Sequence, residues 1–496
     1  MRDSHTQTSS TSSAAVPTSA LAEAAPGHTP NIDPAPTAGH PAPVLWPLHL
    51  GAFLATFMFS VSNVAIPAVQ ADIGASDATS ALIVGLFSAA FASGLILCGR
   101  IGDRFGRRRL FMIGTGSLVI TSLAVGLAPD PFFLLAARTT QGLAAAVMMP
   151  QILASFQHSL TGAARLKAIS LFGAFSGVGT VGGQVLGGGL ISAFGDTWGW
   201  RAAFLSCAVA AAAAFLGSLR LTESHSTDPA PLDAPGAVLL GVGMMCLVIG
   251  LALGPVTGWL PMPAILLTVS ALCFTVFALW QSRAAATGRF PLIPPDVVAV
   301  PAAWAGMLMA LVFFAGFGTF LFNFSLLSQT GHSDPAYVSG LTLAVFCIAF
   351  LVASLVVHRL VASFTGPGTM LLGTGLQIAG LLGVAWVASS AGAGWHLWFQ
   401  GPALILGAGQ AMQFGPLVGT VVGAVPDRLA GLSGGLIATM QQAGIAVGVA
   451  LLGALFHSFT AAVGFDSAFA FACLVQIVLS IVFGAGAWYL HHAGRR

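Results

Sequence analysis

The stretch Gly99-Arg-Ile-Gly-Asp-Arg-Phe-Gly-Arg-Arg-Arg109 places six charged residues between two apolar runs, near 79–98 and 110–128. Each run is about as long as a helix that crosses the hydrocarbon core of a bilayer, which needs about 20 residues. Gly106 can adopt the backbone angles of a tight reversal because it carries no Cβ. The stretch therefore predicts a short charged loop that joins two membrane-spanning helices.

The composition of the whole chain agrees with this prediction. Of its 496 residues, 56% are hydrophobic and only 6% are charged, against about 25% in ordinary soluble domains. Too few charges are present to cover a water-soluble surface, and a net charge of +2 offers no broad basic face for nucleic acid. The composition indicates a protein that crosses the lipid bilayer many times and binds no nucleic acid.

Apolar runs of spanning length recur from Leu45 onward and predict fourteen transmembrane helices. They lie near 45–69, 79–98, 110–128, 132–154, 168–193, 200–219, 235–255, 262–281, 301–328, 337–357, 368–388, 394–418, 430–456 and 468–490. Residues 1–44 are rich in Ala, Pro, Thr and Ser and contain no apolar run, which indicates a disordered cytosolic tail.

The basic residues test this map, because short cytosolic loops of membrane proteins carry an excess of Lys and Arg. With the N-terminus inside, 15 of the 17 basic residues fall on cytosolic segments, and only Arg138 and Arg201 do not. A count wrong by one helix would scatter these charges over both sides. We therefore expect a multi-pass protein of the plasma (inner) membrane with fourteen spans and both termini in the cytosol.

Two parts of the chain resemble each other, Arg109-Leu-Phe-Met-Ile-Gly-Thr-Gly116 and Gly368-Thr-Met-Leu-Leu-Gly-Thr-Gly375. Asn63 and Asn323 correspond within one residue of the same offset. Chance similarity between apolar helices is the alternative. Duplicated halves are the usual construction of secondary transporters. This internal resemblance predicts an N-terminal six-helix half at 45–221, two inserted helices with cytosolic linkers at 222–300, and a C-terminal six-helix half with a short tail at 301–496.

The loop resembles the signature G-x-L-a-D-r-x-G-r-k of the major facilitator superfamily. The residues that fit it are Gly99, Asp103, Arg104, Gly106, Arg107 and Arg108. Asp103 can pair with a neighbouring arginine or a facing helix N-terminus, and such a cluster can hold one arrangement of helices and release it in another. The resemblance implies an all-α major facilitator fold of the fourteen-span drug:proton antiporter type, with these residues as a gating loop. A loop that only fixes membrane orientation is the alternative.

The fourth span carries Arg138, Gln141 and Gly142, in a pattern similar to the family motif l-x-x-x-R-x-x-q-G. A charged side chain inside the membrane is a functional candidate by default, and Gln141 lies one turn away, where it can share hydrogen bonds. We expect Arg138 to serve transport. The alternative is that its side chain reaches outward to water, roughly 9 Å away at helical rise.

The fifth span repeats glycine every four residues at Gly179, Gly183 and Gly187, followed by Gly188. The repeat lines one helix face, on which another backbone can pack closely. The pattern resembles the antiporter motif g-x-x-x-G-P-x-x-G-G of drug-exporting family members, with Gln184 in place of the proline. Packing between small residues and a transport-specific role both stay open.

The first span resembles the motif L-D-x-T-x-v-N-v-A-l-P of fourteen-span drug:proton antiporters. Asn63 and Pro67 fit it, whereas Met58 stands where the family has a proton-carrying aspartate. None of the 15 acidic residues falls within a predicted span. The candidates left for a proton carrier are Asp103 and three histidines at span ends, for which interfacial packing is the alternative role: His49, His396 and His457.

Further amide side chains fall within predicted spans. In hydrocarbon each needs a hydrogen-bond partner or a watery cavity, so these residues either bond between helices or line a transport cavity. They are Asn323, Gln377, Gln410, Gln413 and, in a thirteenth span that resembles the corresponding family span, Gln441 and Gln442.

These patterns predict a secondary transporter and no enzyme. Nucleotide, hydrolase and metal-binding motifs are not found, and no two cysteines have CxxC spacing, so we expect no nucleotide, cofactor or metal. The resemblance implies export of drugs or small organic metabolites in exchange for protons by alternating access. Because the first-span acid is missing, the alternatives are a proton-uncoupled facilitator and an exporter of organic anions attracted by Arg138. An alternative of a different class is a non-transporting membrane sensor on a carrier fold.

Overall fold

A computed structural model describes residues 44–227, 230–289, 291–294, 297, 299–390, 392, 394–425 and 430–493. The predicted tail at 1–44 lies outside the described residues, apart from Val44. Every regular element of the described part is helical. The elements are α1 (Trp46–Ile73), α2 (Asp77–Phe105), α3 (Arg107–Gly126), α4 (Pro131–Ser159), α5 (Gly162–Ser218), α6 (Ala234–Thr257), α7 (Met262–Ala286), α9 (Pro301–Leu326), the π-helical turn η1 (Leu327–Gly331), α10 (Ala336–Phe364), α11 (Gly366–Ser390), α12 (Trp395–Ala424), α13 (Ala430–Gly448), the π-helical turn η3 (Val449–Gly453) and α14 (Ala454–Ala493).

Twelve helical stretches of the described residues are long and apolar enough to cross a membrane. Two of them have double length, Gly162–Ser218 with 57 residues and Ser433–His492 with 60. A straight helix of 57 residues would be about 86 Å long, about three times the hydrocarbon core. Each of the two contains one glycine with a left-handed φ that interrupts the helix, Gly195 at 73° and Gly464 at 81°.

The chain reverses its direction at Gly195. Gly199 lies so close to Ile191 that a Cβ on Gly199 would be 2.4 Å from the Cα of Ile191, whereas eight residues of straight helix span about 12 Å. Glycine adopts such a φ without steric cost. Gly195 therefore divides α5 into two arms, 162–194 and 196–218, and the predicted spans near 168–193 and 200–219 fall on these arms.

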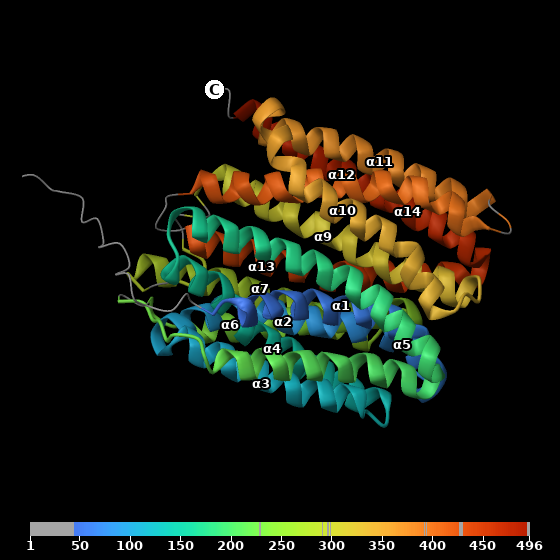
Figure 1. The fold of residues 1–496 in the computed structure, drawn as a ribbon, viewed down its shortest axis with the longest axis horizontal. Coiled ribbons are helices and arrows are strands. Elements are labelled where there is room, and N and C mark those ends of the chain that lie inside the picture. Colours follow the sequence, from blue (N-terminus) through green and yellow to red (C-terminus); the bar gives the residue numbers. More distant parts are fainter. Residues whose placement is uncertain are drawn as a thin grey trace, which may run out of the picture. The chain divides into compact units, whose positions relative to one another are not determined.

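The helices pack in two groups, which Figure 1 shows in blue to green and in yellow to red. In the first group α1 contacts α5, α2 contacts α4, and α3 contacts both α4 and α5. In the second group α11 contacts α12 and α14, α10 contacts α12, and α9 contacts α13. One cluster of buried apolar side chains lies almost wholly in the first group, and a larger one combines the second group with α6 and with side chains of α1 and α2. The helices α6 and α7 pair with each other, and α6 also contacts α2 and α14.

We name the two ends of this bundle by their turns. The arginine end is where α2 passes into α3 at Gly106, and the opposite end is where α1 passes into α2 at Gly74. Both glycines have positive φ, 111° and 66°, which is the region where glycine is favoured. All further positions along the helices are given relative to these ends.

The two groups touch at the opposite end, where α5 meets α10. A Cβ on Gly188 would lie 2.4 Å from the backbone oxygen of Ala336, so the two backbones are in direct contact. The amide of Tyr337 donates to Oγ of Ser192 at 3.1 Å. Toward the arginine end the same two helices expose large apolar side chains, for example Leu355 at 57%.

The helices α1 and α9 also meet between the middle of the bundle and the opposite end. The rings of Phe59 and Phe317 stack with their centroids 6.3 Å apart. One to two turns further along, Nε2 of Gln329 donates to the backbone oxygen of Val64 at 3.1 Å. The groups also meet where α2 packs against α13.

Candidate functional site

The charged loop consists of Gly106 alone, because α2 ends at Phe105 and α3 begins at Arg107. Oδ1 of Asp103 accepts hydrogen bonds from Nε of Arg107 at 3.0 Å and from its Nη2 at 2.8 Å. Both residues belong to the first group of helices. No hydrogen bond or ion pair found among the described residues joins the Asp103 side chain to α9–α14. In this arrangement the Asp103 side chain bonds to Arg107 beside its own loop and makes no described bond to the second group.

Glu223, which the sequence motifs did not single out, completes the loop. Its carboxylate accepts the backbone amides of Arg108 at 3.0 Å and Arg109 at 3.1 Å, in the first turn of α3. Such amides have no partner within the helix, and the helix dipole favours a negative charge there. A Cβ on Gly106 would lie 2.7 Å from the carboxyl carbon, so glycine makes room for Glu223. No local pattern marks Glu223, because its partners lie more than 100 residues away in the sequence.

The remaining motif residues surround this loop. Gly99 faces α4, where a Cβ on it would lie 3.5 Å from Cβ of Pro150. Nη2 of Arg108 donates to the backbone oxygen of Leu219 at 2.9 Å, which ties α3 to the end of α5. The side chain of Arg104 is exposed. The motif therefore joins α2, α3, α4 and α5 at the arginine end.

Arg100 holds the two linkers that flank the α6–α7 pair. Its Nη1 donates to the backbone oxygen of Pro231 at 2.9 Å, and its Nη2 donates to those of Pro291 at 2.6 Å and Leu292 at 3.0 Å. The residue is only 6% exposed. Because the linker at 291–292 leads toward α9, Arg100 connects the first group to the segment that enters the second.

Asp233 stabilises the same region as the N-cap of α6. Its carboxylate accepts hydrogen bonds from the Gly236 amide at 3.0 Å, Nε1 of Trp280 at 2.9 Å, Nε2 of Gln281 at 2.8 Å and the Leu292 amide at 3.0 Å. Burial by itself raises the pKa of this carboxyl, but the four hydrogen bonds outweigh burial and hold the pKa below its ordinary value. A single carboxylate thus fastens α6, α7 and the following linker together.

Arg138 is fully buried within the first group. Its Nε donates to the backbone oxygen of Ile83 at 3.0 Å, and its Nη1 donates to Oε1 of Gln141. Nε2 of Gln141 in turn donates to Oγ of Ser122 at 2.8 Å. The guanidinium lies 4.2 Å from the ring centre of Phe87, a favourable cation–π contact. The side chain does not reach outward to water, so the alternative drawn from the sequence is wrong for this state.

The glycine face of α5 packs on α1. A Cβ on Gly183 would lie 2.5 Å from Cβ of Ser60 and 2.7 Å from the backbone oxygen of Phe57, and a Cβ on Gly179 would lie 2.4 Å from the backbone oxygen of Phe53. Gly187 continues the same face. Backbones approach this closely only where side chains are absent.

Two other motif positions, Gly142 on α4 and Gln184 on α5, also lie at close backbone contacts. A Cβ on Gly142 would lie 2.2 Å from the backbone oxygen of Phe87, so α2 and α4 cross there. Gln184 is 1% exposed, and its backbone oxygen would lie 2.3 Å from a Cβ on Gly340 of α10. The α5 face thus contacts α1 on one side and the second group on the other.

Of the intramembrane amides, one bonds between helices and another bonds within its own helix. Nε2 of Gln413 donates to Oγ1 of Thr374 at 3.1 Å, a bond between α12 and α11, whereas Nδ2 of Asn63 donates within α1. Gln441 is partly buried on α13. The amides that keep at least one buried polar atom without a partner among the described residues are Asn63, Gln151, Gln184, Asn323, Gln400, Gln410, Gln413, Gln442 and Gln476.

The three candidate histidines lie at different ends. Both ring nitrogens of His49 approach backbone oxygens at the arginine end, Leu45 at 3.0 Å and Ala168 at 3.2 Å. His396 and His457 lie at the opposite end, and each pairs with an aspartate at 3.3 Å.

The helices extend past the predicted spans, so some acidic residues that lie between those spans belong to helices. Asp72 and Asp103 lie in the last turns of α1 and α2, and Asp77 begins α2. All three carboxylates remain close to helix ends.

A bundle of two groups of helices with about twelve candidate membrane spans is the architecture of a polytopic membrane protein. The chain belongs to the Major Facilitator Superfamily, whose family profile matches residues 48–449. It is therefore a transporter and not an enzyme.

Relatives with described roles include resistance and export proteins of Streptomyces. The chain is 31% identical over 425 residues to the tetracenomycin C resistance and export protein of Streptomyces glaucescens, covering 85% of this chain and 77% of that one. It is 33% identical over 408 residues to the puromycin resistance protein pur8 of Streptomyces alboniger, covering 81% and 79%.

Solved structures of POT family transporters share the fold. One, in complex with a thioalcohol-conjugated peptide, has a TM-score of 0.65 at 14% identity and covers 90% of this chain and 96% of that one. Another, in complex with 5-aminolevulinic acid, has a TM-score of 0.64 at 13% identity and covers 92% and 98%.

Proposed function

We propose that this protein exports drugs or small organic metabolites from the cytosol by alternating access, in exchange for protons. The observation that carries the proposal is the place at which α5 and α10, one helix from each group, come into contact. They meet from the middle to the opposite end, as at Gly188 and Ala336, while α5 and α10 expose apolar side chains toward the arginine end. A carrier in this state takes substrate from the arginine end.

The proposed topology has fourteen spans with the arginine end in the cytosol. Gly195 and Gly464 each divide a double-length helical stretch, which adds two spans to twelve. The basic residues of the loop at Gly106 then face the cytosol, as the positive-inside rule requires, and so do both termini. In this proposal 45–221 and 301–496 are the two halves of the carrier, and 222–300 carries the inserted pair.

A cluster of aromatic rings supports bulky organic substrates. Phe313, Phe317 and Phe414 stack across α9 and α12 with ring centroids 6.0–6.4 Å apart, and Phe317 continues to Phe59 of α1 in the other group. Aromatic faces favour flat apolar ligands. The relatives' names, which include resistance and export of tetracenomycin C and resistance to puromycin, point to the same class of compound.

A second candidate function is transport without protons. Met58 occupies the position of the family's first-span acid and is fully buried, so no carboxylate is available there. Arg138 is a buried cation whose described hydrogen bonds involve no carboxylate, which favours an organic anion as substrate. This candidate predicts flux that is independent of the pH gradient.

The test is substrate-induced collapse of a pH gradient in inverted membrane vesicles that contain the full chain. The panel holds lipophilic cations, organic anions and antibiotics, and the Asp103→Asn variant is the control. We expect substrate uptake with proton release for the wild type and neither for the control. Uptake with an unchanged gradient would refute proton exchange and favour the second candidate.

A further inference from the structure

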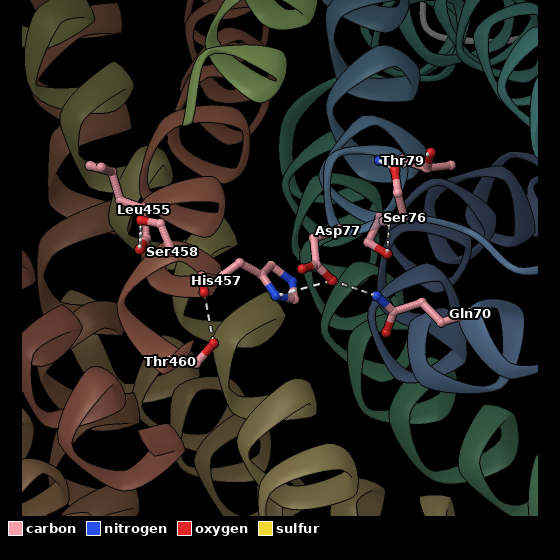
Figure 2. Close-up of polar contacts among 9 residues, drawn as sticks. Gln70, Ser76, Asp77, Thr79, Leu455, His457, Ser458 and Thr460 are labelled. Carbon is pink, nitrogen blue, oxygen red and sulfur yellow. Dashed lines mark hydrogen bonds and ion pairs between the residues drawn. The ribbon is translucent and has the colours of Figure 1, made fainter. Parts of the chain in front are cut away.

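Asp77 and His457 connect the two groups of helices at the opposite end. Nδ1 of His457 lies 3.3 Å from Oδ1 of Asp77, and Figure 2 shows the imidazole pointing from α14 toward the start of α2. Nε2 of Gln70 donates to the same carboxylate oxygen at 3.1 Å. Among the ion pairs of the described residues, only this pair joins the first group to the second; the others, such as His332 with Asp466 at 2.9 Å, stay within one group.

The surroundings of this pair include the inserted helix α6. Pro255 and Val256 at the end of α6 line a cavity of about 190 Å³ together with Asp77, His457 and their neighbours. At Gly85 the helices α2, α6 and α13 cross, since a Cβ there would lie 2.8 Å from the side chain of Val248 in α6. Any separation of the groups at this end must therefore part His457 from Asp77 and open the cavity beside them.

Asp77 is the only charged or titratable group that faces His457 from the described parts of the surrounding helices. From α9 the ring of Phe322 approaches at 6.1 Å between centroids, and from α14 that of Phe456 does so at 6.1 Å. The helix α6 contributes only apolar side chains. A positive charge on His457 would therefore be compensated by the Asp77 carboxylate alone among the described groups.

The burial of the imidazole decides how its protonation affects this contact. The His457 side chain is 10% exposed, and its Nε2 is buried without a partner among the described residues. A neutral imidazole donates Nδ1–H to Asp77 and buries only a lone pair at Nε2. A protonated one buries an unpaired N–H and a positive charge, which costs much more. Asp77 compensates only in part, because it is 54% exposed and already bound by Gln70.

We propose that Asp77 and His457 form an outer latch, which closes the opposite end while His457 is neutral and opens when external acid protonates it. In the open state the imidazole reaches water, where its charged form is stable near its ordinary pKa of about 6.5. The latch deepens the proposed transport cycle and rests on its orientation, in which the opposite end faces outside. It supplies a gate that the proton gradient acts on directly.

The test measures the distance across the latch end. Spin labels are attached to Thr197→Cys in the first group and Ser333→Cys in the second, both exposed near that end, with the partly exposed Cys98, Cys246 and Cys273 replaced by alanine. Distances are recorded in lipid nanodiscs at pH 7.5 and 5.5 without substrate. A protein that exports nothing still reports the latch, so failure of the proposed function and failure of the latch can be told apart.

We expect the ratio of long to short distances in the wild type to rise on acidification, by at most about tenfold per pH unit for one titrating group. His457→Gln, which cannot be protonated, should show the same ratio at both pH values. Asp77→Asn should raise the ratio already at pH 7.5. His332→Gln is the matched control, because its aspartate partner lies within the same group, and it should behave as the wild type.

Three results would overturn the latch. A pH shift that persists in His457→Gln would assign the response to another group. Acidification that favours the short distance would reverse the sign argued from the buried Nε2. An Asp77→Asn protein with the wild-type ratio at pH 7.5 would show that the Asp77 carboxylate does not keep the opposite end closed.

Discussion

Asp233 offers the sharpest test of how the inserted helices are attached. The substitution Asp233→Ala removes the acceptor of four hydrogen bonds, which come from α6, α7 and the linker at Leu292. We expect this change to release the α6–α7 pair locally while the two groups of helices stay folded. The prediction concerns one carboxylate that is 6% exposed.

The magnitude follows from the hydrogen bonds. A bond to a charged group contributes about 1.5–3 kcal/mol net, and donors left buried without a partner cost about 1–3 kcal/mol each. Loss of an N-cap adds about 1 kcal/mol. Such contributions are not additive within one network, so we expect a loss of about 3–5 kcal/mol, comparable to removal of one partner of a buried pair.

Native cysteines provide the assay. Cys246 lies on α6 and Cys273 on α7, both partly exposed, whereas Cys207 on α5 is buried. When opening is fast, labelling by a membrane-permeant maleimide follows the population of the opened form. A loss of about 3 kcal/mol then raises the labelling that passes through the opened form by roughly 100-fold, so Cys246 and Cys273 should react faster in the variant, with Cys207 unchanged.

The effect of pH has a defined sign. Because the pKa of Asp233 is held below its ordinary value, its contribution is complete above the unfolded pKa of about 3.9 and is lost only as pH falls through the lower folded pKa. The ratio of labelling rates between variant and wild type should therefore stay constant from pH 5.5 to 8. Asp196→Ala, which removes an exposed acid beside the Gly195 turn of α5, is the control. Equal labelling of Cys246 in both variants would refute the reasoning.

Three further substitutions test the transport machinery. Asp103→Asn should abolish flux in the vesicle assay, while the amount of membrane-inserted protein, measured by immunoblot, hardly changes. The reason is that a partly exposed ion pair contributes only about 0–1 kcal/mol to stability. Undiminished flux would refute the gating role of Asp103. Gly183→Val should separate α1 from α5, cost about 1–3 kcal/mol in thermal stability in detergent and stop transport, whereas Gly189→Ala, whose Cβ would meet nothing within 4 Å, should be neutral on both measurements. Arg138→Ala should impair flux more strongly than insertion, and retained flux would leave Arg138 a packing role beside Phe87.

Much of the fold could be predicted from the sequence, because its determinants are local. Apolar length defines membrane helices, and a residue such as Gly106 marks a turn by its own backbone freedom. The four-residue spacing of Gly179 and Gly183 places both on one helix face whatever the partner is. The local pattern therefore predicted close backbone packing there, and the structure shows that α1 is what packs.

The polar partners could not be predicted in this way. Asp77 meets His457 across 380 positions of the chain, and Glu223 caps a helix that begins more than 100 residues earlier. Which side chains meet depends on the rotation and the relative height of helices that are distant in the sequence. No periodicity within one helix encodes either quantity.

The membrane environment adds a second reason. Arg138 lies near enough to a helix end to reach water, and its sequence position alone permits either outcome. Only the packing of α2 and α4 provides the Ile83 carbonyl, the Gln141 amide and the Phe87 ring that replace water around the guanidinium. The apolar run around Arg138 is enough to predict a charge within the membrane. What solvates that charge depends on helix packing, because the energy of a buried charge is set by all the groups that surround it.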